Sequence, residues 1–410
     1  MVDILAAPQQ SQTGSRADSG LRTLTLISAA HWVSHFHMLV LPMLFPFLKA
    51  ALSVGYIELG FALTVFAVVS ALTQAPTGYL VDHFGARKIL LIGLCLGGLA
   101  LILLGLKLNY TMLVASAILL GLANSVYHPA DYAILAAHMD EAKMGRAFSI
   151  HTFAGYLGGA VAPAIVAALL TGFGGAGALI ISGAIGILVA ASLMLFGVPE
   201  ASARHQQGAD GTASKQSVIT PALIVLTVFF MLLGLSSAGI SNFGVVALMN
   251  GYGGSYSTAN VALTAYLGAA AAGVLAGGFL ADHTRRHSQV AAVCFGINTA
   301  IVLVIALVAL PAALLMAAMT AAGFLGGVIA PSRDMLVRNA APAGAAGRAF
   351  GIVSTGFNFS GILSPLLFGW IMDQNLPHWV FGLSALFMVL TVLLTPFTER
   401  KPGAAQAEAT

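Results

Sequence analysis

Charged side chains are scarce in this sequence: Asp, Glu, Lys and Arg make up 8% of its 410 residues, whereas soluble domains carry about 25%. Hydrophobic residues account for 59%. Apolar runs such as ILLIGLCLGGLALILLG, residues 89–105, do not alternate with polar residues, which excludes an open sheet and an outer-membrane barrel. The sequence therefore predicts an all-α membrane protein that is embedded in a lipid bilayer.

Cysteine is almost absent, and so are the motifs of most enzymes. The two cysteines, Cys95 and Cys294, lie within apolar runs, which predicts small core residues and excludes a disulfide framework or a thiolate metal centre. The sequence has no phosphate-binding glycine loop, no carboxylate-rich metal cluster and no nucleophile motif. We therefore expect no enzymatic activity, no use of ATP, no cofactor and no bound metal.

Strong basic patches and a signal peptide are also missing. The net charge of +3 is spread over loops and gives no footprint for nucleic acid. The polar segment through Gly20 lacks the cationic start, the apolar core and the cleavage site of a signal peptide. We expect this segment to be a cytoplasmic tail.

Apolar segments of about 20 residues predict twelve membrane-spanning helices. Their centres lie near residues 35, 68, 97, 123, 158, 186, 234, 269, 299, 325, 359 and 387. One sizeable polar connection, PEASARHQQGADGTASKQS, divides six helices from six. The predicted units are an N-terminal tail (1–21), a first six-helix bundle (22–198), a cytoplasmic linker (199–217), a second six-helix bundle (218–398) and a C-terminal tail (399–410).

The distribution of Lys and Arg predicts the orientation. Of seventeen such residues, all but Lys49, Lys107 and Arg333 fall on one side of the predicted bundles or at its rim. Cytoplasmic loops carry the excess of positive charge, so both termini are predicted to be cytoplasmic. The predicted location is the bacterial inner membrane, where we expect a monomer.

The two halves of the sequence share four landmarks in register, at offsets of 200 to 202 residues. They are GYLVD at Gly78 and GFLAD at Gly278, GRAFSI at Gly145 and GRAFGI at Gly347, and the proline pairs Pro129/Pro331 and Pro163/Pro365. Because each half holds an even number of helices, the repeats are parallel and related by an axis along the membrane normal. A transport site is then expected at the midplane, between the halves.

The duplicated layout and one loop resemble the major facilitator superfamily. The loop between the second and third helices matches its signature at Gly78, Leu80, Asp82, Gly85, Arg87 and Leu90. Two positions depart from the pattern: His83 stands where a Lys or Arg is usual, and Arg285 replaces the loop glycine in the second copy. The resemblance implies two pseudo-symmetric six-helix bundles that rock around a central site.

A finer resemblance is to the fosmidomycin-resistance-type branch of that superfamily. It is carried by HWVSH in the first helix, by YHPADYA with Tyr127 and His128 in the fourth, and by GRAFSIHTFAGYLGGAVAP in the fifth. Where an acidic residue is expected one turn after His31, this chain has His35. The resemblance implies proton-driven drug export, and the departure bears on a proton site in the first helix.

The signature loop has a physical role that does not depend on the family name. Asp82 sits at the C-terminal end of its helix, where the helix dipole repels a carboxylate, so it needs a partner such as Arg87 or the N-terminus of another helix. Gly85 permits a tight turn and Gly78 a close helix approach. We expect these residues and Asp282, the second-half counterpart of Asp82, to form a gate, although the loop could serve only to fix topology.

Few carboxylates remain inside the predicted membrane: Asp131 and Asp334. Asp131 follows His128 by three positions, so the two share a helix face. At the offset of 202 residues Asp131 corresponds to Arg333, and we expect these opposite charges to meet when the cytoplasmic side closes. The alternative is that Arg333 pairs locally with Asp282, or that Asp334 ends its helix at the headgroups.

Further candidates are histidines and small polar residues. His31 and His35 lie one turn apart with Ser34 beside them and His37 turned away, and an imidazole titrates near about pH 6.5, so His31 and His35 are candidate proton or substrate ligands. Without a Cys or Glu cluster they do not predict a metal site. His151 is placed to face the fourth helix. The remaining cavity candidates are Ser237 and Asn242 in the seventh helix and Asn358 in the eleventh.

These features favour a proton-coupled transporter of a small molecule. The candidate proton carriers are His31, His35, His128 and Asp131, and the candidate cavity residues are Ser34, Tyr127, His151, Ser237, Asn242, Arg333 and Asn358. Arg333 with nearby histidines suits an anionic substrate. Export is the leading interpretation, import of an organic acid is the alternative, and a transport-inactive sensor is a third.

Overall fold

The computed structural model describes residues 10–139, 143–198, 220–342 and 346–398, and within these ranges it consists of helices joined by short turns. The linker predicted at 199–217 and the C-terminal tail predicted at 399–410 lie outside the described residues. The first helix begins at Gln10, inside the segment predicted as a tail, and its apolar part runs from Gly20 to Met43.

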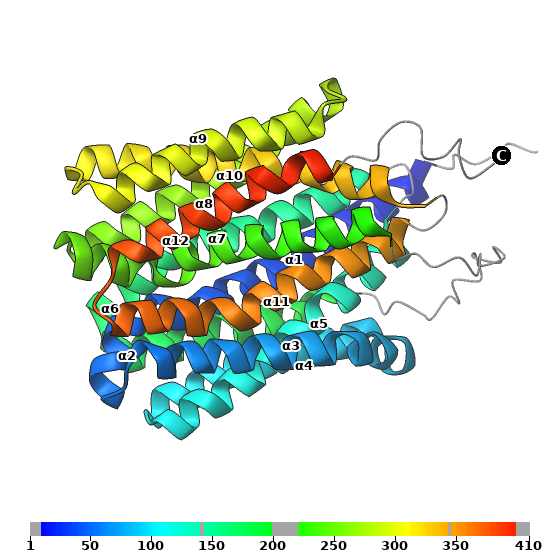
Figure 1. Ribbon diagram of the computed structural model, residues 1–410. Coiled ribbons are helices and arrows are strands. Elements are labelled where there is room, and N and C mark those ends of the chain that lie inside the picture. Colours follow the sequence, from blue (N-terminus) through cyan, green and yellow to red (C-terminus); the bar gives the residue numbers. More distant parts are fainter. Residues whose placement is uncertain (1–9, 140–142, 199–219, 343–345, 399–410) are drawn as a thin grey trace, which may run out of the picture.

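Helices of both halves run along one common direction (Figure 1). The first half contains α1 (Gln10–Met43), the short α2 (Phe45–Leu52), α3 (Tyr56–Phe84), α4 (Ala86–Leu106), α5 (Tyr110–His138) and α6 (Met144–Phe196). The second contains α7 (Pro221–Tyr252), α8 (Tyr256–His283), α9 (His287–Leu307), α10 (Ala312–Ala340), α11 (Ala346–Asp373) and α12 (His378–Leu394). Within the described residues, eleven helices are long and apolar enough to cross a membrane, and the chain is a multi-pass, all-α membrane protein as predicted.

The longest helix, α6, contains two membrane spans. Its 53 residues would extend for about 80 Å at 1.5 Å per residue, far beyond a hydrocarbon core of about 30 Å. The helix breaks at Gly174, whose φ of 70° and ψ of 175° are not helical and which lacks the Cβ that would make this φ costly. Counting the segments on either side of this break gives the twelve predicted spans.

The two halves lie side by side, with the first half drawn in blue to teal and the second in green to red (Figure 1). Across their boundary α3 packs against α11 and α6 packs against α8. Gly60 on α3 makes the approach to α11 possible, since a Cβ there would overlap the carbonyl group of Pro365. We call the end where α3 ends and α11 begins the termini end, and the other the opposite end.

At the opposite end the halves are joined by a carboxylate on a helix N-terminus. The carboxylate of Asp373, the last residue of α11, accepts hydrogen bonds from the backbone N–H groups of Tyr56 and Ile57 in the first turn of α3, both at 2.8 Å. Lys49 Nζ lies 3.5 Å from the same carboxylate. These contacts combine the positive end of a helix dipole with a charge-assisted hydrogen bond. They hold the opposite end closed.

At the termini end the same helices stand apart. A Cβ added to Gly78 on α3 or to Gly351 on α11 would meet no atom within 4 Å, and the same holds for Gly145 on α6 and Gly278 on α8. The expected close approach at Gly78 is therefore not present in this conformation, because the facing helix is too far away. The expected tight turn is present at Gly85, whose φ is 96°. Asp82 and Asp282 are both exposed at this end.

Neutralising Asp373 is expected to loosen the opposite end. In Asp373→Asn a loss of about 1 kcal/mol in the capping interaction corresponds to roughly fivefold more frequent opening. Thr64 on α3, which donates a hydrogen bond to the Ile362 carbonyl of α11, reports on this opening. A cysteine at position 64, in a background without Cys95 and Cys294, should react several-fold faster with a membrane-impermeant thiol reagent applied on the side of the membrane that the opposite end faces.

Glu58→Gln is the matched control for that measurement. Glu58 lies in the same first turn of α3 but is exposed, and its carboxylate accepts only from the backbone N–H of Gly55 among the hydrogen bonds that the structure describes. Its removal should leave the labelling rate unchanged. Equal rates in Asp373→Asn and the unsubstituted chain would contradict the proposed closure.

Candidate functional site

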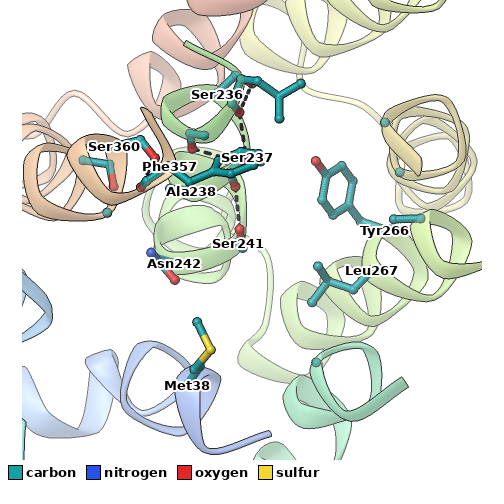
Figure 2. A pocket seen from close by; sticks show the side chains of 18 of the residues that line it. Met38, Ser236, Ser237, Ala238, Ser241, Asn242, Tyr266, Leu267, Phe357 and Ser360 are labelled. Atoms are coloured by element: carbon teal, nitrogen blue, oxygen red, sulfur yellow. Dashed lines mark hydrogen bonds between the residues drawn. The ribbon is translucent and has the colours of Figure 1, made fainter. Parts of the chain in front are cut away.

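A cavity of about 480 Å³ lies between the two halves. It is lined by helices of both halves, from His35 on α1 and Tyr156 on α6 to Tyr266 on α8 and Arg333 on α10. Figure 2 shows Ser237, Ser241 and Asn242 of α7 with Met38 of α1 on one side and Tyr266 of α8 on another. Its position between the repeats is the one predicted for a transport site.

The polar wall of the cavity comes mainly from α7. The hydroxyl groups of Ser237 and Ser241 donate to carbonyl groups one turn earlier on their own helix, those of Leu233 and Ser237. Their oxygens remain able to accept, and the amide of Asn242 can both donate and accept. This wall can therefore orient a polar substrate without adding a charge.

Arg333 is the only charged side chain among the described residues that line the cavity, apart from the titratable His35. Its guanidinium carbon lies 4.9 Å from the ring centre of Phe230 and 5.2 Å from that of Phe357, and the two ring centres are 4.9 Å apart, so the group lies against an aromatic pair. Arg333 Nε also donates to Asp334 Oδ1 at 2.9 Å. The cavity thus has a fixed positive group and mostly apolar surroundings.

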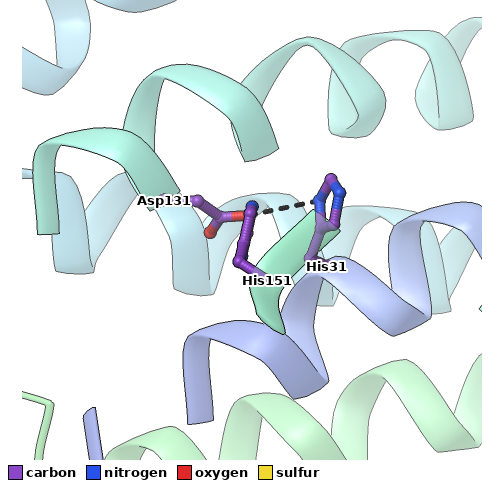
Figure 3. A group of neighbouring side chains, drawn as sticks. All are labelled: His31, Asp131 and His151. Atoms are coloured by element: carbon purple, nitrogen blue, oxygen red, sulfur yellow. Dashed lines mark ion pairs between the residues drawn. The ribbon is translucent and has the colours of Figure 1, made fainter. Parts of the chain in front are cut away.

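A second polar group is buried inside the first half, next to the cavity. His31 Nδ1 on α1 and His151 Nε2 on α6 each lie 3.6 Å from Oδ2 of Asp131 on α5. Figure 3 shows the three side chains converging from their separate helices. Asp131 and His151 are fully buried and His31 is nearly so. The expectation that His151 faces the fourth span is confirmed by its distance to Asp131.

Histidine rings connect this buried group to the cavity. His35 lines the cavity, and its ring centre lies 4.8 Å from that of His31. The His31 ring stacks on His151 at 4.0 Å and lies 5.3 Å from His128. All four predicted proton-carrier candidates are therefore gathered in one region, and His35 is the member that reaches the cavity.

Several predicted cavity residues lie elsewhere. Ser34 and Tyr127 line a separate space of about 10 Å³, and His151 belongs to the buried group. Asn358 is exposed and does not line the cavity. The neighbouring Phe357 and Ser360 do line the cavity, so a different face of α11 is turned toward it. Of the cavity candidates, the structure places Ser237, Asn242 and Arg333 on the cavity wall.

The expected ion pair between the halves is not formed in this conformation. Asp131 is buried against His31 and His151, whereas Arg333 pairs with its neighbour Asp334. Neither predicted local alternative is seen: Arg333 pairs with its neighbour Asp334 and not with Asp282, and α10 continues past Asp334 to Ala340. A carboxylate enclosed by its own half is poorly placed to reach across the cavity.

Other residues of the site carried weak sequence signals. Phe230 and Phe357, which lie against Arg333, look like ordinary apolar residues in apolar helices. Tyr132 lies 5.9 Å from His151 between ring centres, and its place one turn after His128 was the only hint. Nothing in the sequence indicates that Asp373, a carboxylate outside the predicted membrane, joins the halves.

Gly155 on α6 makes room for the histidine pair. A Cβ at this position would lie 2.6 Å from His31 Nε2 and 2.9 Å from His35 Cδ2. Both distances are shorter than van der Waals contact, so a larger residue would displace the rings. The missing side chain of Gly155 therefore allows α6 to pack closely against α1.

Comparison with known proteins agrees with this architecture. A family model of the Major Facilitator Superfamily matches residues 27–250 and 226–410. The chain is 27% identical over 292 residues to the Fosmidomycin resistance protein of Escherichia coli (strain K12). The aligned region covers 69% of this chain and 70% of that protein. It is 28% identical over 143 residues to a probable L-galactonate transporter of the same strain, covering 35% and 32% of the two chains.

The fold is also similar to solved structures. A bacterial homolog of the human lysosomal transporter Spinster, in an inward-facing and occupied conformation, superimposes with a TM-score of 0.75 at 16% identity. The match covers 92% of this chain and 96% of that one. At this identity the similarity establishes the fold alone.

Gly155→Ala is expected to destabilise the protein through His31. Overpacking a close-packed site costs about 1–3 kcal/mol, so the melting temperature measured by size-exclusion chromatography after heating should fall by several degrees. In a His31→Ala background the same substitution should cost less, because the nearer of the two colliding rings is gone. Gly172→Ala on α6, where no atom lies within 4 Å of an added Cβ, is the control. An equal loss in both backgrounds would contradict the contact.

Proposed function

The chain belongs to the Major Facilitator Superfamily and transports a small molecule across a membrane, and we propose that it exports an anionic compound in exchange for protons. The observation that carries this proposal is the buried Asp131 with its two histidines, joined by His35 to a cavity whose fixed charge is Arg333. The proposed setting is the bacterial inner membrane, with both termini in the cytoplasm and the protein acting as a monomer.

Proton coupling is supported by the position of Asp131. A carboxylate inside a membrane is costly when charged, so such residues are usually functional. Both oxygens of Asp131 are buried without a hydrogen-bond donor among the described residues, and imidazole nitrogens lie at 3.6 Å. A proton held by this group would remove the unfavourable charge. His35 gives the proton a route to the cavity.

An anionic substrate is supported by Arg333. A guanidinium that lies against a pair of aromatic rings is restricted in orientation and can form two parallel hydrogen bonds to a carboxylate or phosphonate. Apart from His35, the rest of the cavity wall is apolar or carries neutral hydroxyl and amide groups. A substrate with one anionic end and a less polar body fits these surroundings.

Export is supported by the relative named for fosmidomycin resistance, which aligns with more than two thirds of the chain. Import of an organic acid with protons is the second candidate, favoured by the shorter match to a probable L-galactonate transporter. Both directions use the same cavity and the same buried group. A sensor without transport would bind a ligand but move none.

Vesicles distinguish these functions. In inverted vesicles with a respiration-generated pH gradient, an exporter should dissipate the gradient when fosmidomycin or another small acid is added, while vesicles without the protein should not respond. An importer should be silent there but should alkalinise the medium around right-side-out vesicles on addition of its substrate. Binding without flux in both preparations would indicate a sensor and overturn the proposal.

Asp131→Asn is expected to abolish substrate-induced proton movement, because an amide cannot carry the proton. A fluorescent pH probe in the vesicles measures this, and substrate binding to the purified variant shows that it is folded. Glu58→Gln removes an exposed carboxylate at the opposite end and should behave like the unsubstituted protein. Wild-type proton movement in Asp131→Asn would remove the proposed carrier.

Arg333→Gln should raise the KM for an anionic substrate by about tenfold or more with a smaller change in maximal rate, since a charge-assisted hydrogen bond is lost. Arg338→Gln, on the same helix but exposed, is the matched control and should leave the KM unchanged. An unaltered KM in Arg333→Gln would show that this residue does not bind the anion. The measurement is the initial rate of substrate-induced proton movement against substrate concentration.

A further inference from the structure

Three potential metal ligands converge inside the first half. His31 Nδ1, Asp131 Oδ2 and His151 Nε2 all lie within 4.8 Å of one another, and both nitrogens are 3.6 Å from the carboxylate oxygen (Figure 3). The ligands come from α1, α5 and α6, so they are brought together only by the tertiary fold. The sequence did not predict this group, because its members are about 20 to 120 residues apart.

None of these ligand atoms has a hydrogen-bond partner among the described residues, although all are buried. Leaving a buried donor or acceptor unsatisfied costs about 1–3 kcal/mol, and more for a charged group. A single cation placed among the three atoms would satisfy all of them. Separate hydrogen bonds would require a shorter approach than 3.6 Å.

The spacing and the chemical types match a particular class of ion. In a tetrahedral zinc site, bonds of about 2.0–2.2 Å place neighbouring ligand atoms about 3.3–3.5 Å apart, close to the two 3.6 Å separations found here. Two imidazoles with one carboxylate suit Zn²⁺ and other first-row transition metals. Mg²⁺ and Ca²⁺ prefer ligand sets made of oxygen.

The surroundings supply a further imidazole and a route. The ring of His128 lies 5.3 Å from His31, and its Nδ1 is buried without a hydrogen-bond partner among the described residues. His35, at 4.8 Å from His31, lines the central cavity. An ion that enters the cavity therefore meets an imidazole at each step toward Asp131.

We propose that His31, Asp131 and His151 bind a divalent transition-metal ion of the Zn²⁺ class, which reaches them from the central cavity past His35. The ion would bind α1, α5 and α6 to one another within a single half. It adds no bond across the boundary between the halves. The proposal concerns metal binding by the protein itself and holds whether or not protons drive transport.

The test uses untagged full-length protein, purified in detergent and stripped of metal with a chelator. Equilibrium dialysis against Zn²⁺, followed by elemental analysis, should find about one bound ion per chain, the stoichiometry of a single closed site. His151→Gln and Asp131→Asn should each weaken binding by at least about tenfold. His83→Gln is the control, because His83 is exposed at the turn between α3 and α4.

Two further readouts keep the test decisive if a variant fails to fold. Zn²⁺ should raise the melting temperature of the unsubstituted protein, and Co²⁺ should give the visible absorption of a low-coordinate nitrogen and oxygen site. The proposal is overturned if the unsubstituted protein binds no Zn²⁺, or if well-folded His151→Gln and Asp131→Asn bind it as tightly as His83→Gln does.

The outcome is separable from the proposed transport function. Substrate-induced proton movement by a protein that binds no Zn²⁺ would overturn the metal site alone. Zn²⁺ binding by a protein that moves no substrate would overturn the transport mechanism alone.

Discussion

The carboxylate of Asp373 on the first turn of α3 is the contact on which the arrangement of the two halves depends. It joins the end of one half to the beginning of a helix in the other, with two hydrogen bonds of 2.8 Å and a nearby Lys49. This contact closes the opposite end, whereas Gly78 and Gly351 at the termini end face open space. Together these two features determine the shape of the cavity between the halves. Asp82 lies at the other end of α3, near the C-terminus of that helix, and is exposed.

The division of labour between the halves follows from where the charges lie. The first half encloses Asp131 with histidines from two other helices, and the second half carries Arg333 on the cavity wall. An internal duplication supplies two similar scaffolds, but the side chains at corresponding positions on α5 and α10 have opposite charge. One half is thereby suited to holding a cation and the other to binding an anion.

Much of the fold could be predicted from the sequence, because lipid restricts the backbone to a few solutions. Apolar runs near residues 158 and 186 indicated two spans where the structure has one long helix broken at Gly174. The buried group was harder to predict. Asp131 and His151 can each be identified as candidates from the sequence. Their contact depends on how α1, α5 and α6 pack, which the spacing of residues along the chain does not reveal. The position of Asn358 relative to the cavity could not be predicted for a related reason, because the sequence does not say which face of α11 meets the cavity.

The pairing of Arg333 with its neighbour Asp334 has an electrical consequence. Both residues belong to the same helix, so in this conformation Arg333 has its counter-ion beside it. The anionic substrate proposed above would then add a full negative charge to what crosses the bilayer, and each charge is worth about 2.3 kcal/mol per 100 mV of membrane potential. The number of cations exchanged for that anion would decide whether the transmembrane voltage assists the cycle or opposes it.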